Sequence, residues 1–242
     1  MGKQYWRGGN MLYPVPAVMV SCGRPEERPN IITVAWAGTV CSSPAMVSIS
    51  VRKERYSYDI LKETGEFVIN LITRDLTYAT DFCGVRSGRD VDKFAQMHLT
   101  PLPSRYISAP GIAESPVNLE CKVTQVIPLG SHDMFLAEVL GVTVDEKYMD
   151  ENGKFHLNDA GLVAYSHGEY FELGEKLGKF GYSVAKKQAA KTESVTKSAK
   201  PSGAGKKAAS AENRTASKTG AGNRRKSASK TGSADKQKSR RK

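Results

Sequence analysis

The stretch Asn30–Ser57, NIITVAWAGTVCSSPAMVSISVRKERYS, contains the pattern that decides the fold. Two runs rich in Val, Ile, Thr and Trp, at about 31–40 and 45–52, are typical of β-strands, and Ser42-Ser43-Pro44 separates them. Within the second run, two sets of side chains alternate: Met46, Ser48 and Ser50 with Val47, Ile49 and Val51. A period of two predicts a strand whose two faces meet different surroundings.

Further strands are predicted on both sides of this stretch. They lie in the apolar, proline-broken run 12–22 and at 67–71, 117–127, 134–145 and 161–166. Short helices are predicted at 58–64, ending before Gly65, at 75–84 and at about 92–98. Strands dominate and helices occupy connections, so the pattern favours a mainly β fold, a closed or nearly closed barrel with short peripheral helices. No G-x-G-x-x-G follows a strand, which argues against a dinucleotide-binding doubly wound sheet.

The composition changes after Tyr182, the last aromatic residue. Residues 183–242 hold 18 Lys+Arg and 3 Asp+Glu; subtraction from the totals of 36 and 25 leaves 18 and 22 for residues 1–182, so the net charges are +15 and −4. The C-terminal part carries too few apolar side chains to offset the entropy cost of ordering. We therefore predict a folded domain over 1–182 and a disordered basic tail over 183–242.

The four cysteines, Cys22, Cys41, Cys83 and Cys121, lie far apart and form no C-x-x-C pair, which argues against a zinc site. The N-terminal residues lack the apolar core of a signal peptide, and no run reaches the ~18 apolar residues of a membrane span. These observations predict a cytoplasmic protein with reduced thiols. No Gly-x-Ser-x-Gly, H-E-x-x-H or paired-carboxylate motif points to a hydrolase.

A basic, hydroxyl-containing cluster follows the second strand and precedes a predicted helix. It consists of Arg52, Lys53, Arg55 and Ser57. Free N–H groups and the helix dipole favour anions at a helix N-terminus, and arginine adds bidentate contacts. A solvated loop is the simpler interpretation of this cluster alone, but together with the strand pair it predicts a phosphate site.

The order of these features resembles the flavin reductase-like family of FMN-binding split barrels, close to its flavoredoxin members. That family shows a polar residue, a strand ending near Trp and a small-residue loop before Pro. Taken singly, Asn30, Thr33 and Trp36 have a simpler interpretation as a turn residue, a strand threonine and a core tryptophan. The resemblance, which covers about residues 10–182, implies that FMN lies along six residues: Asn30, Thr33, Ala35, Trp36, Ser42 and Ser43.

Three later residues are assigned by the same resemblance. Lys93, in the segment GRDVDKF, matches a lysine that the family brings toward the cofactor. His132, in the predicted hairpin turn Gly130–Asp133, matches a histidine placed over the flavin near the nicotinamide, and is the candidate catalytic residue; Ser131 stands where Asp is common in the family. Tyr165 matches an aromatic side chain that closes the flavin pocket. Each of the three also has a structural interpretation, as an exposed lysine, a solvated turn histidine and a barrel aromatic.

The resemblance implies a homodimeric oxidoreductase that passes electrons from NAD(P)H through FMN to a flavin, iron or protein acceptor. One alternative is an FMN electron carrier reduced by a partner protein. Another is a nucleic-acid-binding protein that acts through its tail, because basic low-complexity segments neutralise phosphates without sequence preference. Binding to an anionic membrane surface, without insertion, or a role in solubility alone are further interpretations of the tail.

Overall fold

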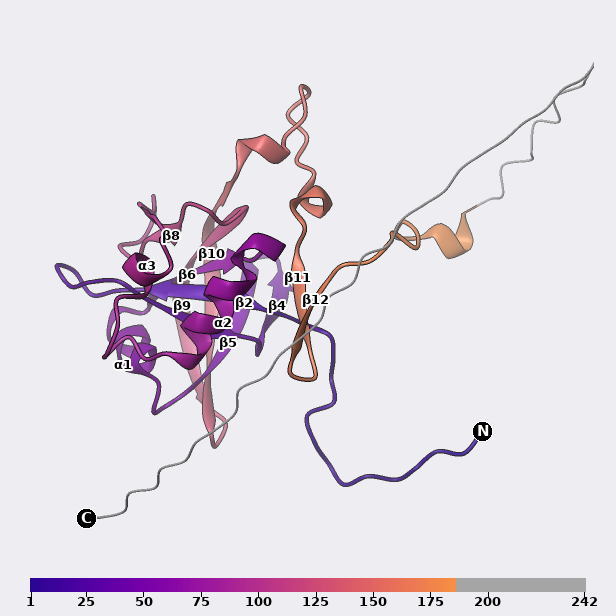
Figure 1. The fold of residues 1–242 in the computed structure, drawn as a ribbon, viewed down its shortest axis with the longest axis horizontal. Helices are drawn as coiled ribbons and strands as arrows, with labels where there is room; N and C mark the ends of the chain where they lie inside the picture. The colour runs from indigo at the N-terminus through magenta and orange to yellow at the C-terminus, as the bar shows by residue number, and fades with distance from the viewer. Residues whose placement is uncertain (186–242) are drawn as a thin grey trace, which may run out of the picture. The chain divides into compact units, whose positions relative to one another are not determined.

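A computed structural model describes residues 1–185 of the chain (Figure 1). The predicted disordered tail therefore lies, from residue 186 onward, outside the described residues. No helix within the described part is long and apolar enough to cross a membrane.

A seven-stranded antiparallel sheet forms the body of the domain, and this confirms the prediction of a mainly β fold. Across the sheet the strand order is β3 (Asn30–Val34), β2 (Val18–Cys22), β6 (Glu66–Leu71), β9 (Val117–Pro128), β10 (His132–Val144), β5 (Ala45–Arg52) and β4 (Ala37–Ser42). The long β9–β10 hairpin turns at Gly130, whose φ is +90°, as the turn at 130–133 predicts.

The sheet closes on itself through residues 35 and 36. Consecutive strands β3 and β4 lie at opposite edges of the sheet, and the backbone N–H of Ser50 in β5 donates to the carbonyl of Trp36 at 2.8 Å. The single strand predicted at 31–40 is thus wrong, since the chain must leave one edge and join the other between Val34 and Ala37. This corner takes Ala35 and Trp36 out of the strand ladder.

The remaining strands form two smaller sheets. One joins β1 (Val15–Pro16), β11 (Val163–Ser166) and β12 (Glu169–Glu172), and the other joins β7 (Pro101–Leu102) to β8 (Gly111–Ile112). The prolines of the 12–22 run do divide it into two strands, β1 and β2. Strand β12, which was not predicted, follows a turn at His167 and Gly168, both at positive φ.

The helices occupy connections, as predicted. They are α1 (Tyr56–Thr64), α2 (Thr77–Val85) and α3 (Lys93–Gln96), with short 3-10 turns at η1 (Arg74–Leu76), η2 (Glu146–Tyr148), η3 (Leu157–Ala160) and η4 (Tyr182–Val184). Helices α1 and α2 contact β2 and β3. Both helices therefore pack beside the edge of the large sheet that β3 and β2 form.

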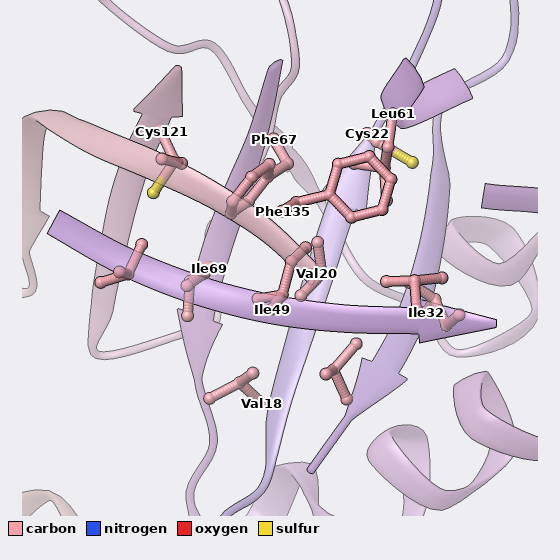
Figure 2. Close-up of a cluster of buried hydrophobic side chains, with 14 of the residues drawn as sticks. Val18, Val20, Cys22, Ile32, Ile49, Leu61, Phe67, Ile69, Cys121 and Phe135 are labelled. Carbon is pink, nitrogen blue, oxygen red and sulfur yellow. The ribbon is translucent and has the colours of Figure 1, made fainter. Parts of the chain in front are cut away.

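Alternation along β2 separates two apolar clusters. Val18, Val20 and Cys22 point into the first cluster, inside the sheet, together with Ile49, Phe67 and Phe135 of other strands (Figure 2). Met19 points to the opposite face and packs in a second cluster with residues of β3, β8, the helices and a loop: Ile31, Ile72, Leu76, Phe94 and Ile112. Burial of both faces of β2 fixes its register, because a slip of one residue would exchange the two faces.

Replacement of Gly65 by alanine is expected to lower the free energy of unfolding by about 1 kcal/mol. Gly65 ends α1 at φ +63°, its N–H donates to the Leu61 carbonyl at 3.0 Å, and nothing lies within 4 Å of an added Cβ. The cost is therefore conformational and not steric. Urea unfolding measures it, and Gly38→Ala is the control, since Gly38 also has open space but no positive φ.

Candidate functional site

Two adjoining cavities open between the end of β5, the start of α1 and the corner after β3. The first, the basic cavity, has a volume of about 430 Å³ and is lined mainly by polar and charged residues: Asn30, Ile32, Arg52, Glu54, Arg55, Tyr56, Ser57, Cys83, Arg86, Ser87, Gly88, Arg89 and Lys93. The second, the aromatic cavity, has about 540 Å³ and is lined by Asn10, Tyr13, Ile32, Thr33, Val34, Ala35, Trp36, Ser50, Val51, Arg52, Arg55, Ser131, His132 and Tyr165. Ile32, Arg52 and Arg55 line both cavities, so these form one continuous site.

The basic cavity is built around the N-terminus of α1. The residue before the helix, Arg55, makes no side-chain cap, and its carbonyl accepts from the Tyr58 N–H at 2.9 Å, so the N–H groups of Tyr56 and Ser57 are the first-turn donors that can meet an anion. Five cationic side chains line the cavity against the single carboxylate of Glu54, which pairs with Arg52 at 3.3 Å. The cavity thus carries a net charge of +4 and favours an anionic group.

Asn30 and Ser57 form the floor of the basic cavity. Both are buried, and Asn30 Nδ2 donates to Ser57 Oγ at 2.7 Å, which holds the hydroxyl in place at the start of α1. Gly88 lies directly over this pair, since a Cβ on it would stand 2.1 Å from Asn30 Oδ1. Only glycine allows the loop after α2 to approach this closely.

Lys93 is buried beside the same floor, where its side chain lines the cavity. Its Nζ donates to the backbone carbonyls of Ile31 at 2.6 Å and Cys83 at 2.8 Å. Burial lowers the pKa of Lys93 to about 8. The lysine therefore ties α3 to β3 and α2 and supplies positive charge near the floor, in place of the exposed helix position that was the alternative.

The aromatic cavity takes its walls from the strand corner and from three distant segments. Thr33 is fixed by a hydrogen bond from its hydroxyl to the Thr80 carbonyl. The ring of Tyr13, from the N-terminal segment, lies 6.2 Å from the rings of both Trp36 and Tyr165, centre to centre. Three aromatic side chains thus line a cavity that is also lined by polar residues such as Thr33 and His132, a setting suited to a flat, partly polar ring.

His132 enters the aromatic cavity from the β9–β10 hairpin. Its Nδ1 lies 2.9 Å from Ser131 Oγ, and the turn is closed by a hydrogen bond from the Leu129 N–H to the His132 carbonyl at 2.9 Å. Burial, followed by the charge of Arg52, lowers the pKa of His132 below its ordinary value. The imidazole is therefore mainly uncharged at neutral pH, with Nε2 available to a ligand.

A histidine NMR titration is expected to give His132 a pKa below 6.5, and Arg52→Gln is expected to raise it because a neighbouring positive charge is removed. Since the unfolded chain binds this proton more tightly than the folded protein, protonation favours unfolding. The contribution of His132 to stability should therefore be lost as the pH falls through its unfolded pKa of about 6.5 toward its lower folded value. An unchanged pKa in Arg52→Gln would contradict the assignment of the shift to this arginine.

Three predicted site residues do not line either cavity. Ser42 and Ser43 are exposed at the tip of the β4–β5 hairpin, because β4 carries them away from the corner along the opposite edge of the sheet. Lys53 turns to the other side of β5, where its Nζ lies 3.4 Å from Asp133 Oδ1. The structure brings together the other nine: Asn30, Thr33, Ala35, Trp36, Arg52, Ser57, Lys93, His132 and Tyr165.

Asp133, which lies beside Lys53, forms a buried pair with Tyr58 that joins α1 to the β9–β10 hairpin. Tyr58 of α1 donates its hydroxyl to Asp133 Oδ2 at 2.5 Å, and Asp133 directly follows His132. This hydrogen bond raises the pKa of Tyr58 to about 12 and lowers the pKa of Asp133. The pair fixes the start of α1, which forms the basic cavity, against the hairpin that carries His132.

Some lining residues were not assigned a role from the sequence. Arg86 and Arg89 flank Ser87 and Gly88 in the loop after α2, and this spacing of arginines around small residues is the signal that could have indicated an anion-binding loop. Asn10 and Tyr13 come from an N-terminal segment without a recognisable motif. Among residues 1–185, no group of three or more His, Cys, Asp or Glu side chains is placed to hold a metal ion.

Comparison with known proteins identifies the family to which this fold belongs. Residues 10–174 match the model of the flavin reductase like domain. An uncharacterised protein of Archaeoglobus fulgidus is 31% identical over 160 residues, which cover 66% of this chain and 88% of the relative. The structure of a flavoredoxin from Desulfovibrio vulgaris (Miyazaki F) has a TM-score of 0.71 and 33% identity, covering 76% of this chain and all of that one.

A structure described as an FMN-binding protein from Thermus thermophilus has a TM-score of 0.61 at 23% identity, covers 74% of this chain and 97% of that one, and shows the same fold. The β-barrel, its connecting helices and all residues that line the two cavities lie within the matched range. The chain belongs to the flavin reductase-like family.

Proposed function

We propose that this protein is an FMN-binding oxidoreductase that holds the phosphate in the basic cavity and the flavin ring in the aromatic cavity. The observation that supports this most directly is the continuity of the two cavities across Ile32, Arg52 and Arg55. A ligand with an anionic group at one end and a flat heteroaromatic ring at the other matches both halves of the site. Flavoredoxin similarity and the FMN-binding relative favour the same ligand.

In this proposal, each part of the site has one role. Arg52, Arg55 and the first turn of α1 bind the phosphate, Ser57 donates its hydroxyl to it, and Asn30 holds Ser57 in position. Thr33 and Ala35 line the polar edge of the ring, and Trp36 and Tyr165 contact its apolar surface. Lys93 adds positive charge beneath the phosphate.

Bound FMN would supply the redox chemistry of the site, which would carry electrons from NAD(P)H to a flavin, iron or protein acceptor. The chain's residues position the reactants and set the local field. His132, uncharged at neutral pH, contacts the reductant or acceptor through Nε2, and its orientation is set by Ser131.

A second function, an FMN electron carrier reduced by a partner protein, is favoured by the 33% identity to flavoredoxin over all of that chain. The two functions share the site and differ in the electron donor. Anaerobic titration of the purified protein with FMN, followed by NADH or NADPH, separates them by the visible absorption spectrum. Bound flavin bands that bleach with nicotinamide support the reductase, bands that persist support the carrier, and no bound flavin refutes both.

A homodimer is part of the proposal. Strand β4 forms an edge of the large sheet and exposes Val40, and the neighbouring segment exposes Met11 and Leu12. A cavity of about 470 Å³ lies between residues 9–12, Val15 and the corner at 35–37, on the same part of the molecule. An unpaired edge next to apolar side chains is typical of a pairing surface. Light scattering after size exclusion tests this: a monomer at all concentrations would refute it.

We also propose that residues 183–242, with a net charge of +15, bind nucleic acid or another polyanion without sequence preference. Deletion of these residues is expected to abolish DNA binding at low salt and to leave FMN binding unchanged. Fluorescence anisotropy with a labelled duplex, repeated at increasing salt, measures the effect. If the truncated protein bound DNA as tightly as the full chain, the tail would have no such role.

A further inference from the structure

The segment that follows β12, residues 173–182, exposes large apolar side chains to water. We call this segment the apolar arm. Leu177 is 93% exposed and Phe180 is fully exposed, while Leu173 and Tyr182 are 57% and 66% exposed. None of the four belongs to either apolar cluster of the domain. A group of large apolar side chains in water within one short segment marks a surface that another molecule covers.

The far end of the apolar arm has a defined shape. It forms a turn in which the Tyr182 N–H donates to the Lys179 carbonyl at 2.9 Å, and Gly181 supplies the positive φ of +82°. The Tyr182 ring lies against Gly178, where a Cβ would stand 2.7 Å from the ring. Phe180 is thus presented by a turn that is already formed. A pre-formed turn loses little conformational entropy when its aromatic side chain docks.

The same domain contains an apolar groove that could receive such a side chain. The groove is the cavity of about 470 Å³ between residues 9–12, Val15 and the corner at 35–37, and no charged side chain lines it. Met11 and Leu12, in its wall, are 59% and 87% exposed. The groove therefore has the size and the apolar lining that suit the end of the apolar arm.

A second copy of the chain is the occupant that fits this groove best. The arm and the groove are both exposed in the single chain, and they start from opposite edges of the three-stranded sheet: β12 leads into the arm, and β1 contributes Val15 to the groove. The groove also includes Ala37, the first residue of β4, so it adjoins the unpaired edge that exposes Val40. Two-fold symmetry would place each arm on the other copy's groove and cover both at once.

We propose that the apolar arm of one copy docks, through Leu177 and Phe180, in the apolar groove of a second copy. This inference rests on the homodimer of the proposed function and deepens it by naming the segment that each copy contributes. Asn10, Ala35 and Trp36 line both the groove and the aromatic cavity. The docked arm therefore supports, from the outer side, the wall of the partner's aromatic cavity.

The first test measures the dimer dissociation constant of the double variant Leu177→Ser/Phe180→Ser by analytical ultracentrifugation. Loss of the two anchoring side chains is expected to raise this constant about 100-fold. Both side chains are exposed in the single chain, so the variant should fold, and circular dichroism checks it. Tyr78→Ser/Val85→Ser is the matched control, with an expected change below about 3-fold. It removes two side chains of α2 that are 76% and 70% exposed and line neither the groove nor the basic or aromatic cavity.

Crosslinking then identifies the chain on which the apolar arm docks. Gly9→Cys places a thiol in the wall of the groove, where nothing lies within 4 Å, and Lys179→Cys places one beside Phe180. Both are made with Cys41→Ser, since the other three cysteines are buried. The two chains are mixed and treated with a short bismaleimide. A crosslinked dimer that exceeds the product of either chain alone, and that is lost when Leu177→Ser/Phe180→Ser is added, supports the exchange of arms.

The remaining outcomes separate this inference from the proposed function. A chain with both cysteines that crosslinks only within itself would mean that the arm covers its own groove, which overturns the inference. A double variant that dimerises as tightly as wild type, with no crosslink in the mixture, also overturns it and leaves the homodimer standing. A wild-type protein that stays monomeric at all concentrations refutes the inference and the homodimer together, and titration of the same sample with FMN decides the flavin function independently.

Discussion

Replacement of Arg55 by glutamate is expected to weaken FMN binding by about 100-fold or more and to leave riboflavin binding within about 2-fold. Arg55 lies directly before α1 and lines both cavities, so its guanidinium stands where the phosphate joins the rest of the ligand. The substitution removes a charge-assisted hydrogen bond and adds a carboxylate that repels the phosphate. The new carboxylate also lies at the positive end of the α1 dipole, where it competes with the phosphate for this anion site.

Riboflavin is the internal control in this experiment because it has the ring but lacks the phosphate. Arg55 is exposed, and within the described residues its side chain makes one hydrogen bond, to the Gly84 carbonyl at 3.3 Å, so the variant should fold. Arg105→Glu provides the same charge change on a residue outside the cavities. Equal losses of affinity for FMN and for riboflavin would mean that the phosphate binds elsewhere. Equal losses of FMN affinity in Arg55→Glu and Arg105→Glu would mean that the effect comes from net charge alone.

Much of the fold follows from local patterns, and the main error shows where these fail. The alternation in residues 45–52 gives β5, and Gly65 ends α1 as expected, because both depend on neighbours in the sequence. The division of residues 31–40 into β3 and β4 depends instead on barrel closure. Both halves are apolar and β-branched, and no glycine or proline marks the corner at Ala35 and Trp36.

The site was harder to predict than the fold for the same reason. Ser42 and Ser43 follow Trp36 closely in the sequence, but β4 carries them to an exposed hairpin tip. Arg86 and Arg89 are far from Ser57 in the sequence, and the contact of Gly88 with Asn30 brings them to the same cavity. Proximity of that kind is created by tertiary packing, which a single sequence does not display.

Buried side chains that line neither cavity hold the two cavities in a fixed position relative to each other. Tyr58 and Asp133 join α1 to β10, and the Tyr58 ring packs edge-on against Phe135 at 5.8 Å between centres. Phe135 is fully buried, pairs with Ile49 of β5 and lies two residues after Asp133. The phosphate half and the ring half of the site therefore share one apolar support inside the barrel (Figure 2).

Replacement of Phe135 by alanine is accordingly expected to lower the free energy of unfolding by about 4 kcal/mol, since a fully buried aromatic ring is lost and the surrounding strands cannot collapse onto the cavity. A loss of this size is a large part of the ~5–15 kcal/mol that stabilises a typical domain. Urea unfolding measures it. Removal of the ring also loosens Tyr58, so affinity for riboflavin and for FMN should fall together, unlike the selective loss in Arg55→Glu.

Leu140→Ala is the matched control for Phe135→Ala, because Leu140 lies on the same strand and is 39% exposed. An exposed position leaves no cavity, and the expected cost is below about 1 kcal/mol. If the two variants lost similar stability, Phe135 would not be the support that we infer. If Phe135→Ala weakened FMN but not riboflavin, the ring would act on the basic cavity alone, and the coupling of the two cavities through Tyr58 and Asp133 would be refuted.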